Sequence, residues 1–155
     1  MSYNYVVTAS KPTNVTHSLV GNFCSATEAH LIVAKSTRLE VFALGSEGLL
    51  PLHDVPLFGR VACLALFRPE GEPRDLLFLT TERYQFCVLA YDPHTKALVT
   101  RSSGSVRDRI GRPTDAGQFV LVDPRARLVA CHLYDGLLKV IPVAAGGALR
   151  EAYNM

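Results

Sequence analysis

The sequence predicts an all-β protein, a partial β-propeller of about three four-stranded antiparallel blades. The first observation behind this prediction is that short apolar runs alternate with clusters of Gly, Pro, Asp and Ser, the pattern of strands joined by turns. The second is that a hairpin pattern recurs at a period of roughly 40–50 residues, which is the spacing of propeller blades. No segment carries the sustained apolar stripe of an amphipathic helix.

The elements follow from these patterns in chain order. Residues 3–9 alternate and are rich in β-forming side chains, so we expect a strand there, separate from the blade units. The first blade unit covers roughly residues 15–60, with apolar runs at 31–34 and 39–44 around a polar step. The second covers roughly 61–105, with runs at 76–79 and 84–89. The third covers roughly 106–155, with runs at 128–133 and 137–141. Asp135 and Gly136 join the last pair, and an Asp-Gly dipeptide favours a two-residue hairpin loop because its second position tolerates φ > 0.

A single β-sandwich is the alternative, because a chain of 155 residues can also fill such a fold. The repeat favours blades over the sandwich. A closed propeller needs at least four blades and commonly seven, which at this period is roughly 300 residues. We therefore expect the chain to be the beginning of a longer ring.

Composition excludes several classes of protein. Hydrophobic residues make up 48% of the chain and charged residues 19%, so a disordered tail is excluded. The net charge of +2 is too small for the dense basic face of most nucleic-acid-binding domains. No apolar run is long enough to span a membrane. The four cysteines, Cys24, Cys63, Cys87 and Cys131, form no Cys-x-x-Cys pair, and we expect reduced thiols in a nuclear or cytoplasmic protein.

Catalytic and cofactor motifs are absent. The sequence has no Gly-x-Ser-x-Gly elbow, no P-loop and no His-Glu-x-x-His. Cys131 and His132 are adjacent on an expected strand, so they point to opposite faces and cannot share a metal. We therefore expect no enzyme activity, no catalytic residue, no metal ligand and no cofactor.

The unusual polar segment is residues 101–112. It carries Arg101, Arg107, Arg109 and Arg112 with Asp108 as its one acidic residue. Arginine is enriched at interface hot spots, so we expect Arg107, Arg109 and Arg112 to bind a partner. The alternative is a structural loop whose arginines are tied to groups of the next blade.

Several segments resemble one family, the large subunits of UV-damaged DNA-binding proteins. They are residues 1–13, 34–40, 66–71, 75–78, 108–113 and 133–142, and they occur in the family's order along nearly the whole length of the chain. The segment at 108–113 reads Asp-Arg-Ile-Gly-Arg-Pro and contains two of the candidate arginines.

The resemblance implies a non-catalytic adaptor of a cullin-RING ubiquitin ligase, linked to DNA repair and built of three propellers. This chain resembles about the first three blades of the first propeller. The implied partners are WD-repeat substrate receptors and, through regions outside this chain, a cullin scaffold. DNA would be reached indirectly through a partner subunit. The implied location is the nucleus and cytoplasm. The alternative function is direct contact with damaged DNA.

Overall fold

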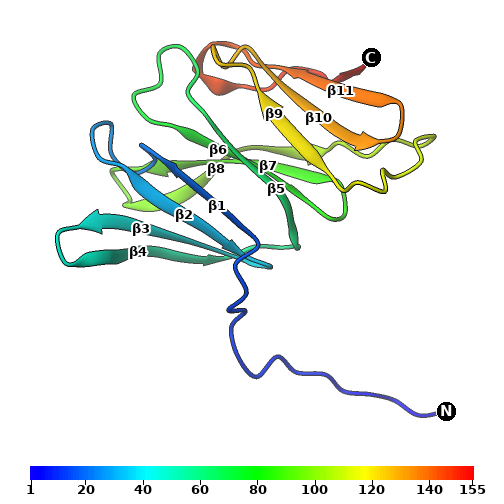
Figure 1. Cartoon of the computed structure of the whole chain (residues 1–155), viewed down its shortest axis with the longest axis horizontal. Coiled ribbons are helices and arrows are strands. Elements are labelled where there is room, and N and C mark those ends of the chain that lie inside the picture. Colours follow the sequence, from blue (N-terminus) through cyan, green and yellow to red (C-terminus); the bar gives the residue numbers. More distant parts are fainter.

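The computed structural model describes residues 1–155 and contains three four-stranded antiparallel sheets. This confirms the predicted all-β partial propeller, and the two-layer sandwich is not formed (Figure 1). In strand order the sheets are β1-β2-β3-β4, β5-β6-β7-β8 and β12-β11-β10-β9. The strands of the first sheet are β1 His17–Gly21, β2 His30–Lys35, β3 Arg38–Gly45 and β4 Gly48–Pro56. The second holds β5 Val61–Phe67, β6 Leu76–Thr81, β7 Gln85–Asp92 and β8 Ala97–Ser105. The third holds β9 Phe119–Val122, β10 Leu128–Tyr134, β11 Leu137–Pro142 and β12 Tyr153–Asn154.

Several tight turns between strands contain a residue with positive φ. Asp135 and Gly136 link β10 to β11 as a two-residue loop, and Gly136 has φ of 70°. Ser36 has φ of 57° between β2 and β3, and Tyr84 has φ of 59° just before β7. A non-glycine residue at positive φ is uncommon, so these two turns are held by the sheets around them. The only helical element is the short 3₁₀ turn Ala145–Gly147, and no helix is long and apolar enough to cross a membrane.

The core lies between the sheets, which pack face to face. The first and second sheets bury a cluster that includes Phe23, Ile32 and Leu77. The second and third bury another that includes Phe78 and Val129. Because both faces of the second sheet are covered, every residue of β6 is buried, which explains its continuous apolar run without alternation. Full burial of each large apolar side chain stabilises the folded state by about 1.5–3 kcal/mol relative to leaving it in water.

One end of the three sheets gathers the turns that link neighbouring blades. We call it the loop face and define it as residues 36–37, 57–60, 82–84, 106–112 and 135–136. Backbone hydrogen bonds join these turns in series. The amide of Val61 donates to the carbonyl of Ser36 at 2.9 Å, and that of Glu82 donates to the carbonyl of Arg60 at 2.9 Å. The amide of Asp135 donates to the carbonyl of Arg112 at 2.9 Å.

The strand expected over residues 3–9 is absent, because residues 1–16 contain no strand. Tyr3 and Tyr5 are 87% and 94% exposed, and no backbone hydrogen bond joins residues 3–9 to a strand. Figure 1 shows the arm leaving the body of the molecule next to the first sheet. β-forming side chains alone do not make a strand without a partner edge.

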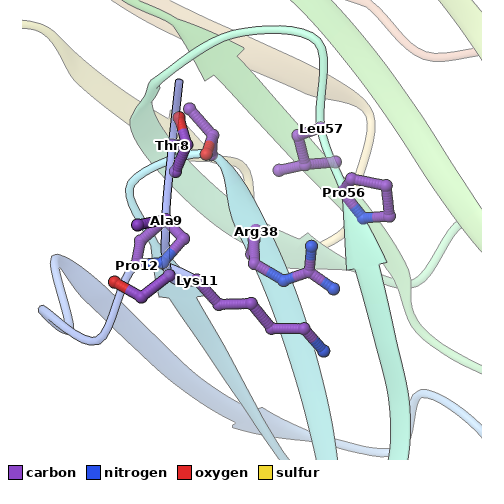
Figure 2. Close-up of a pocket in the computed structure, with 9 residues that line it drawn as sticks. Thr8, Ala9, Lys11, Pro12, Arg38, Pro56 and Leu57 are labelled. Atoms are coloured by element: carbon purple, nitrogen blue, oxygen red, sulfur yellow. The ribbon is translucent and has the colours of Figure 1, made fainter. Parts of the chain in front are cut away.

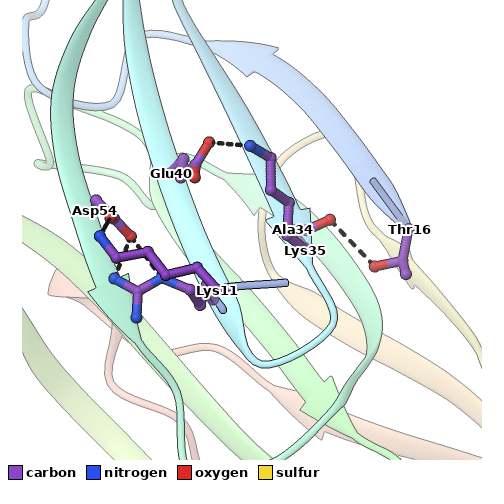
Figure 3. Close-up of polar contacts among 7 residues, drawn as sticks. Lys11, Thr16, Ala34, Lys35, Glu40 and Asp54 are labelled. Carbon is purple, nitrogen blue, oxygen red and sulfur yellow. Dashed lines mark hydrogen bonds and ion pairs between the residues drawn. The ribbon is translucent and has the colours of Figure 1, made fainter. Parts of the chain in front are cut away.

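The end of this arm nearest the body is tied to the first sheet. Asp54 on β4 accepts hydrogen bonds from Lys11 Nζ at 2.7 Å and from Arg38 Nε at 2.8 Å (Figure 3). These two partners, Lys11 first, lower the pKa of Asp54. Residues 8–12 and the neighbouring turn enclose a shallow, mostly polar hollow that Pro56 and Leu57 also line (Figure 2).

Candidate partner-binding surface

The connection between β8 and β9, which carries the candidate arginines, is anchored at its start. Val106 is buried, and its amide donates to the carbonyl of Tyr84 at 2.8 Å. The amide of Asp108 donates to the hydroxyl of Tyr134 at 3.0 Å. The rings of Tyr84 and Tyr134 stack with centroids 5.0 Å apart, so the loop lies over a packed aromatic pair.

The carboxylate of Asp108 holds the next part of the loop. It accepts hydrogen bonds from the amide of Ile110 at 3.1 Å and from Asn154 Nδ2 at 2.7 Å, and Lys139 Nζ lies 3.8 Å away. These contacts lower the pKa of Asp108, and the Ile110 amide is the largest cause. Asp108 is therefore ionised at neutral pH and connects the loop to β11 and β12.

Gly111 fits here because the backbone passes very close to an aromatic ring. A Cβ at position 111 would lie 2.5 Å from Cγ of Tyr134. Pro113 forms an isolated β-bridge with Tyr134 directly afterwards. The loop is therefore held on both sides of Gly111, which reduces the ordering entropy that a bound partner would remove.

The structure separates the three predicted partner-binding arginines into two kinds. Arg107 and Arg109 are exposed, and their side chains take part in no ion pair or hydrogen bond. Arg112 lies 3.2 Å from Asp115 and 3.7 Å from Asp135, measured from guanidinium nitrogen to carboxylate oxygen. Such exposed ion pairs contribute little to the stability of the fold. They do place the Arg112 guanidinium against carboxylates of this chain, which favours the alternative of a structural role for Arg112. Partner binding by the three residues stays a prediction.

Arg101 does not join the others. It lies on β8, and its guanidinium is 3.6 Å from the carboxylate of Glu72, in the connection between β5 and β6. That connection lies at the opposite end of the second sheet from the loop face, because consecutive antiparallel strands reverse direction.

No group of three or more His, Cys, Asp or Glu side chains is placed to hold a metal ion. His132 is half-buried on β10 beside the buried Cys131, as the strand pattern predicts. Burial raises the pKa of Cys24 to about 11 and that of Cys131 to about 12. Both thiols are therefore protonated near neutral pH, which makes them poor nucleophiles.

Sequence reasoning missed two exposed arginines on the same face, Arg60 and Arg83. Arg60 precedes β5, and Arg83 lies in the turn between β6 and β7. Together with Arg107, which follows β8, they lie at one end of the second sheet. The only signal in the sequence was the blade repeat, which aligns these turns at one end of each unit.

Comparison with known proteins identifies the family of the chain. The family model described as "RSE1/DDB1/CPSF1 first beta-propeller" matches residues 14–154. The chain belongs to this family. It is 60% identical over 154 residues to DNA damage-binding protein 1a of Arabidopsis thaliana and 58% identical over 153 residues to DNA damage-binding protein 1 of Solanum lycopersicum. Both alignments cover 99% of this chain.

The chain spans about 14% of the length of these relatives. The predicted family is thereby confirmed, and the chain corresponds to a DNA-damage-related propeller domain. Neither the family description nor the names of the relatives indicates an enzyme activity.

Proposed function

We propose that this chain is a non-catalytic adaptor module of a cullin-RING ubiquitin ligase and acts in the nucleus and cytoplasm. In this proposal it forms part of a platform for WD-repeat substrate receptors, and the cullin scaffold contacts regions outside this chain. The observation that carries the proposal is family membership over residues 14–154, together with a rigid loop that exposes Arg107 and Arg109.

The loop suits protein recognition for a physical reason. Loops on a rigid sheet scaffold are exposed and tolerate change, so binding residues concentrate there. The side chains of Arg107 and Arg109 are already free of intramolecular partners. A receptor carboxylate could therefore pair with either guanidinium without first breaking an existing ion pair, and Arg pairs well with carboxylates at interfaces.

The proposal is tested by affinity capture. The tagged chain is expressed in plant cells, and co-purifying proteins are quantified by mass spectrometry for the parent chain and for an Arg107→Glu/Arg109→Glu variant. The matched control is Arg125→Glu/Arg150→Glu, which makes the same charge change at two exposed arginines outside the loop face. Enrichment of WD-repeat proteins that falls in the first variant and not in the control supports the proposal. Equal recovery from all three chains contradicts it.

Direct binding to damaged DNA is a second candidate function. The names of the relatives and the unpaired arginines of the loop face favour it. The small net charge of +2 weighs against it, because few phosphates can be neutralised at once.

A further inference from the structure

The arginines without a partner are concentrated at one end of the molecule. The chain has twelve arginines. Five of them are ion-paired with carboxylates, and Arg74 donates to the carbonyl of Tyr91. The six whose side chains have no ion pair or hydrogen bond are Arg60, Arg83, Arg107, Arg109, Arg125 and Arg150. Four of these six belong to the loop face, so unsatisfied positive charge gathers there.

Three of these arginines lie in a row along one end of the second sheet, since Arg60 precedes β5, Arg83 lies between β6 and β7, and Arg107 follows β8. The amide of Glu82 donates to the carbonyl of Arg60, which places the turn before β7 beside the connection after β4. The amide of Val106 donates to the carbonyl of Tyr84, which places the start of the next loop beside the same turn. Glu82 is the one exposed carboxylate among them and forms no ion pair. The positive patch consists of Arg60, Arg83 and Arg107.

An apolar cavity opens beside this patch, between the first and second sheets. Its volume is about 390 Å³. Leu79 and Leu89, both part of the core, contribute to its lining, and Leu57, Phe86 and Leu98 line it as well. We call this cavity the anchor pocket. Gln85, two residues after Arg83, also lines it, so the pocket and the positive patch are adjacent.

Phe58 stands at this pocket with its side chain fully in solvent, at a relative exposure of 108%. It follows Pro56 and Leu57, which border the neighbouring hollow in Figure 2. A fully exposed aromatic side chain beside an apolar pocket is costly to leave in water, and such residues are typical of interaction sites.

We propose that the anchor pocket binds an acidic peptide segment. One apolar side chain of the segment fills the pocket against Phe58, and flanking Asp or Glu residues pair with Arg60, Arg83 and Arg107. Charge complementarity identifies the occupant, because Arg60 and Arg83, each two residues from a lining residue of the pocket, and Arg107 at the same end of the sheet are exposed and have no ion pair. Apolar anchors in pockets, surrounded by polar contacts, are the usual arrangement of interface hot spots.

A single-stranded nucleic acid fits this surface less well. Its binding sites combine a positive groove with several aromatic rings on which bases stack. Phe58 is the one fully exposed aromatic ring among the loop-face residues, because Tyr84 is half-buried against Tyr134. Apart from Phe58 and Phe86, the apolar residues that line the pocket are mainly aliphatic, which suits a Leu or Phe side chain better than a base.

The inference rests on the proposed function, because a substrate receptor would supply the acidic segment. Synthetic peptides replace the receptor in the test, so that its result does not depend on receptor capture. The probe is a fluorescein-labelled peptide of about twelve residues with a central Leu flanked by Asp and Glu. The 155-residue chain is titrated into it at low salt, and fluorescence anisotropy reports binding. The comparison peptides replace the acidic residues with Lys, or the central Leu with Ser.

Binding of the acidic peptide is expected to weaken about tenfold in an Arg60→Glu/Arg83→Glu variant and several-fold in Phe58→Ser. All three positions are exposed, so the thermal unfolding midpoint should not change, and the Arg125→Glu/Arg150→Glu control should bind like the parent. The Ser-centred peptide should bind more weakly than the Leu-centred one.

Three results would overturn the inference. They are equal binding of the acidic and Lys-containing peptides, an equal loss in the control variant, and tighter binding of a mixed-sequence single-stranded DNA than of the acidic peptide at the same salt. If the peptides fail while WD-repeat proteins are still captured through Arg107 and Arg109, only this inference is lost. If the peptides bind and capture fails, only the proposed function is lost.

Discussion

Replacing Gly111 with Ala should destabilise the chain and disturb the loop that presents Arg109. The added Cβ would lie 2.5, 2.6 and 2.8 Å from Cγ, Cδ1 and Cβ of Tyr134. These atoms are at the root of a side chain that is 4% exposed and stacked on Tyr84, so they cannot rotate away. Ordinary contact requires the loop and the ring to separate by roughly 1 Å, and overpacking of this kind typically costs about 1–3 kcal/mol.

The assay is urea-induced unfolding followed by far-ultraviolet circular dichroism, with the thermal midpoint as a second measure. For a chain of this size each kcal/mol lowers the midpoint by about 2–4 °C. Gly45→Ala is the control, because its closest neighbour is the terminal methyl Cδ1 of Leu50, an exposed side chain that can move. A Gly111→Ala variant as stable as Gly45→Ala would refute the reasoning about this close approach.

Three other predictions follow from the fold and its charges. Apolar side chains such as Leu49 and Leu121 are 49% and 73% exposed on the outer sheets, so the chain should self-associate in light-scattering chromatography, and a strict monomer at all concentrations would contradict this. Burial, followed by the nearby His30, lowers the pKa of His53 from its ordinary 6.5. The folded state therefore favours neutral His53, and stability should fall as pH drops below about 6.5 toward the lower folded pKa, a dependence that His53→Gln should reduce. The chain alone should bind duplex DNA weakly, at about 10⁻⁴–10⁻⁶ M, and measured selectivity for UV-irradiated over intact duplex at physiological salt would contradict that expectation.

The sequence predicted the sheets well because the determining signals are local. Asp135 and Gly136 are a complete hairpin turn by themselves, and the apolar runs on either side become β10 and β11. The continuous run at residues 76–79 fits the middle strand of a sheet covered on both faces. The strand expected over residues 3–9 failed because a strand needs a partner edge, which no local pattern can provide.

The candidate surface was predictable only in part, because it depends on packing between blades. The polar segment at residues 101–112 indicated Arg107 and Arg109, and both lie exposed on the loop face. Arg112, from the same segment, faces two carboxylates, one of which belongs to the next hairpin. Arg60 and Phe58 carry no local signal, since Arg60 lies beside Glu82 through the pairing of β5 with β6, and Phe58 borders a pocket formed between the first and second sheets.

The central claim, that the loop face is the interaction surface, is tested most directly by hydrogen–deuterium exchange. The chain is labelled alone and with a purified WD-repeat substrate receptor, and protection is read along the backbone. Slower exchange is expected at residues 57–60, 82–84 and 106–112, and no change at the opposite-end turns, residues 46–47, 93–96 and 123–127. Protection confined to those opposite turns, or none at all under conditions where the receptor is captured, would contradict it.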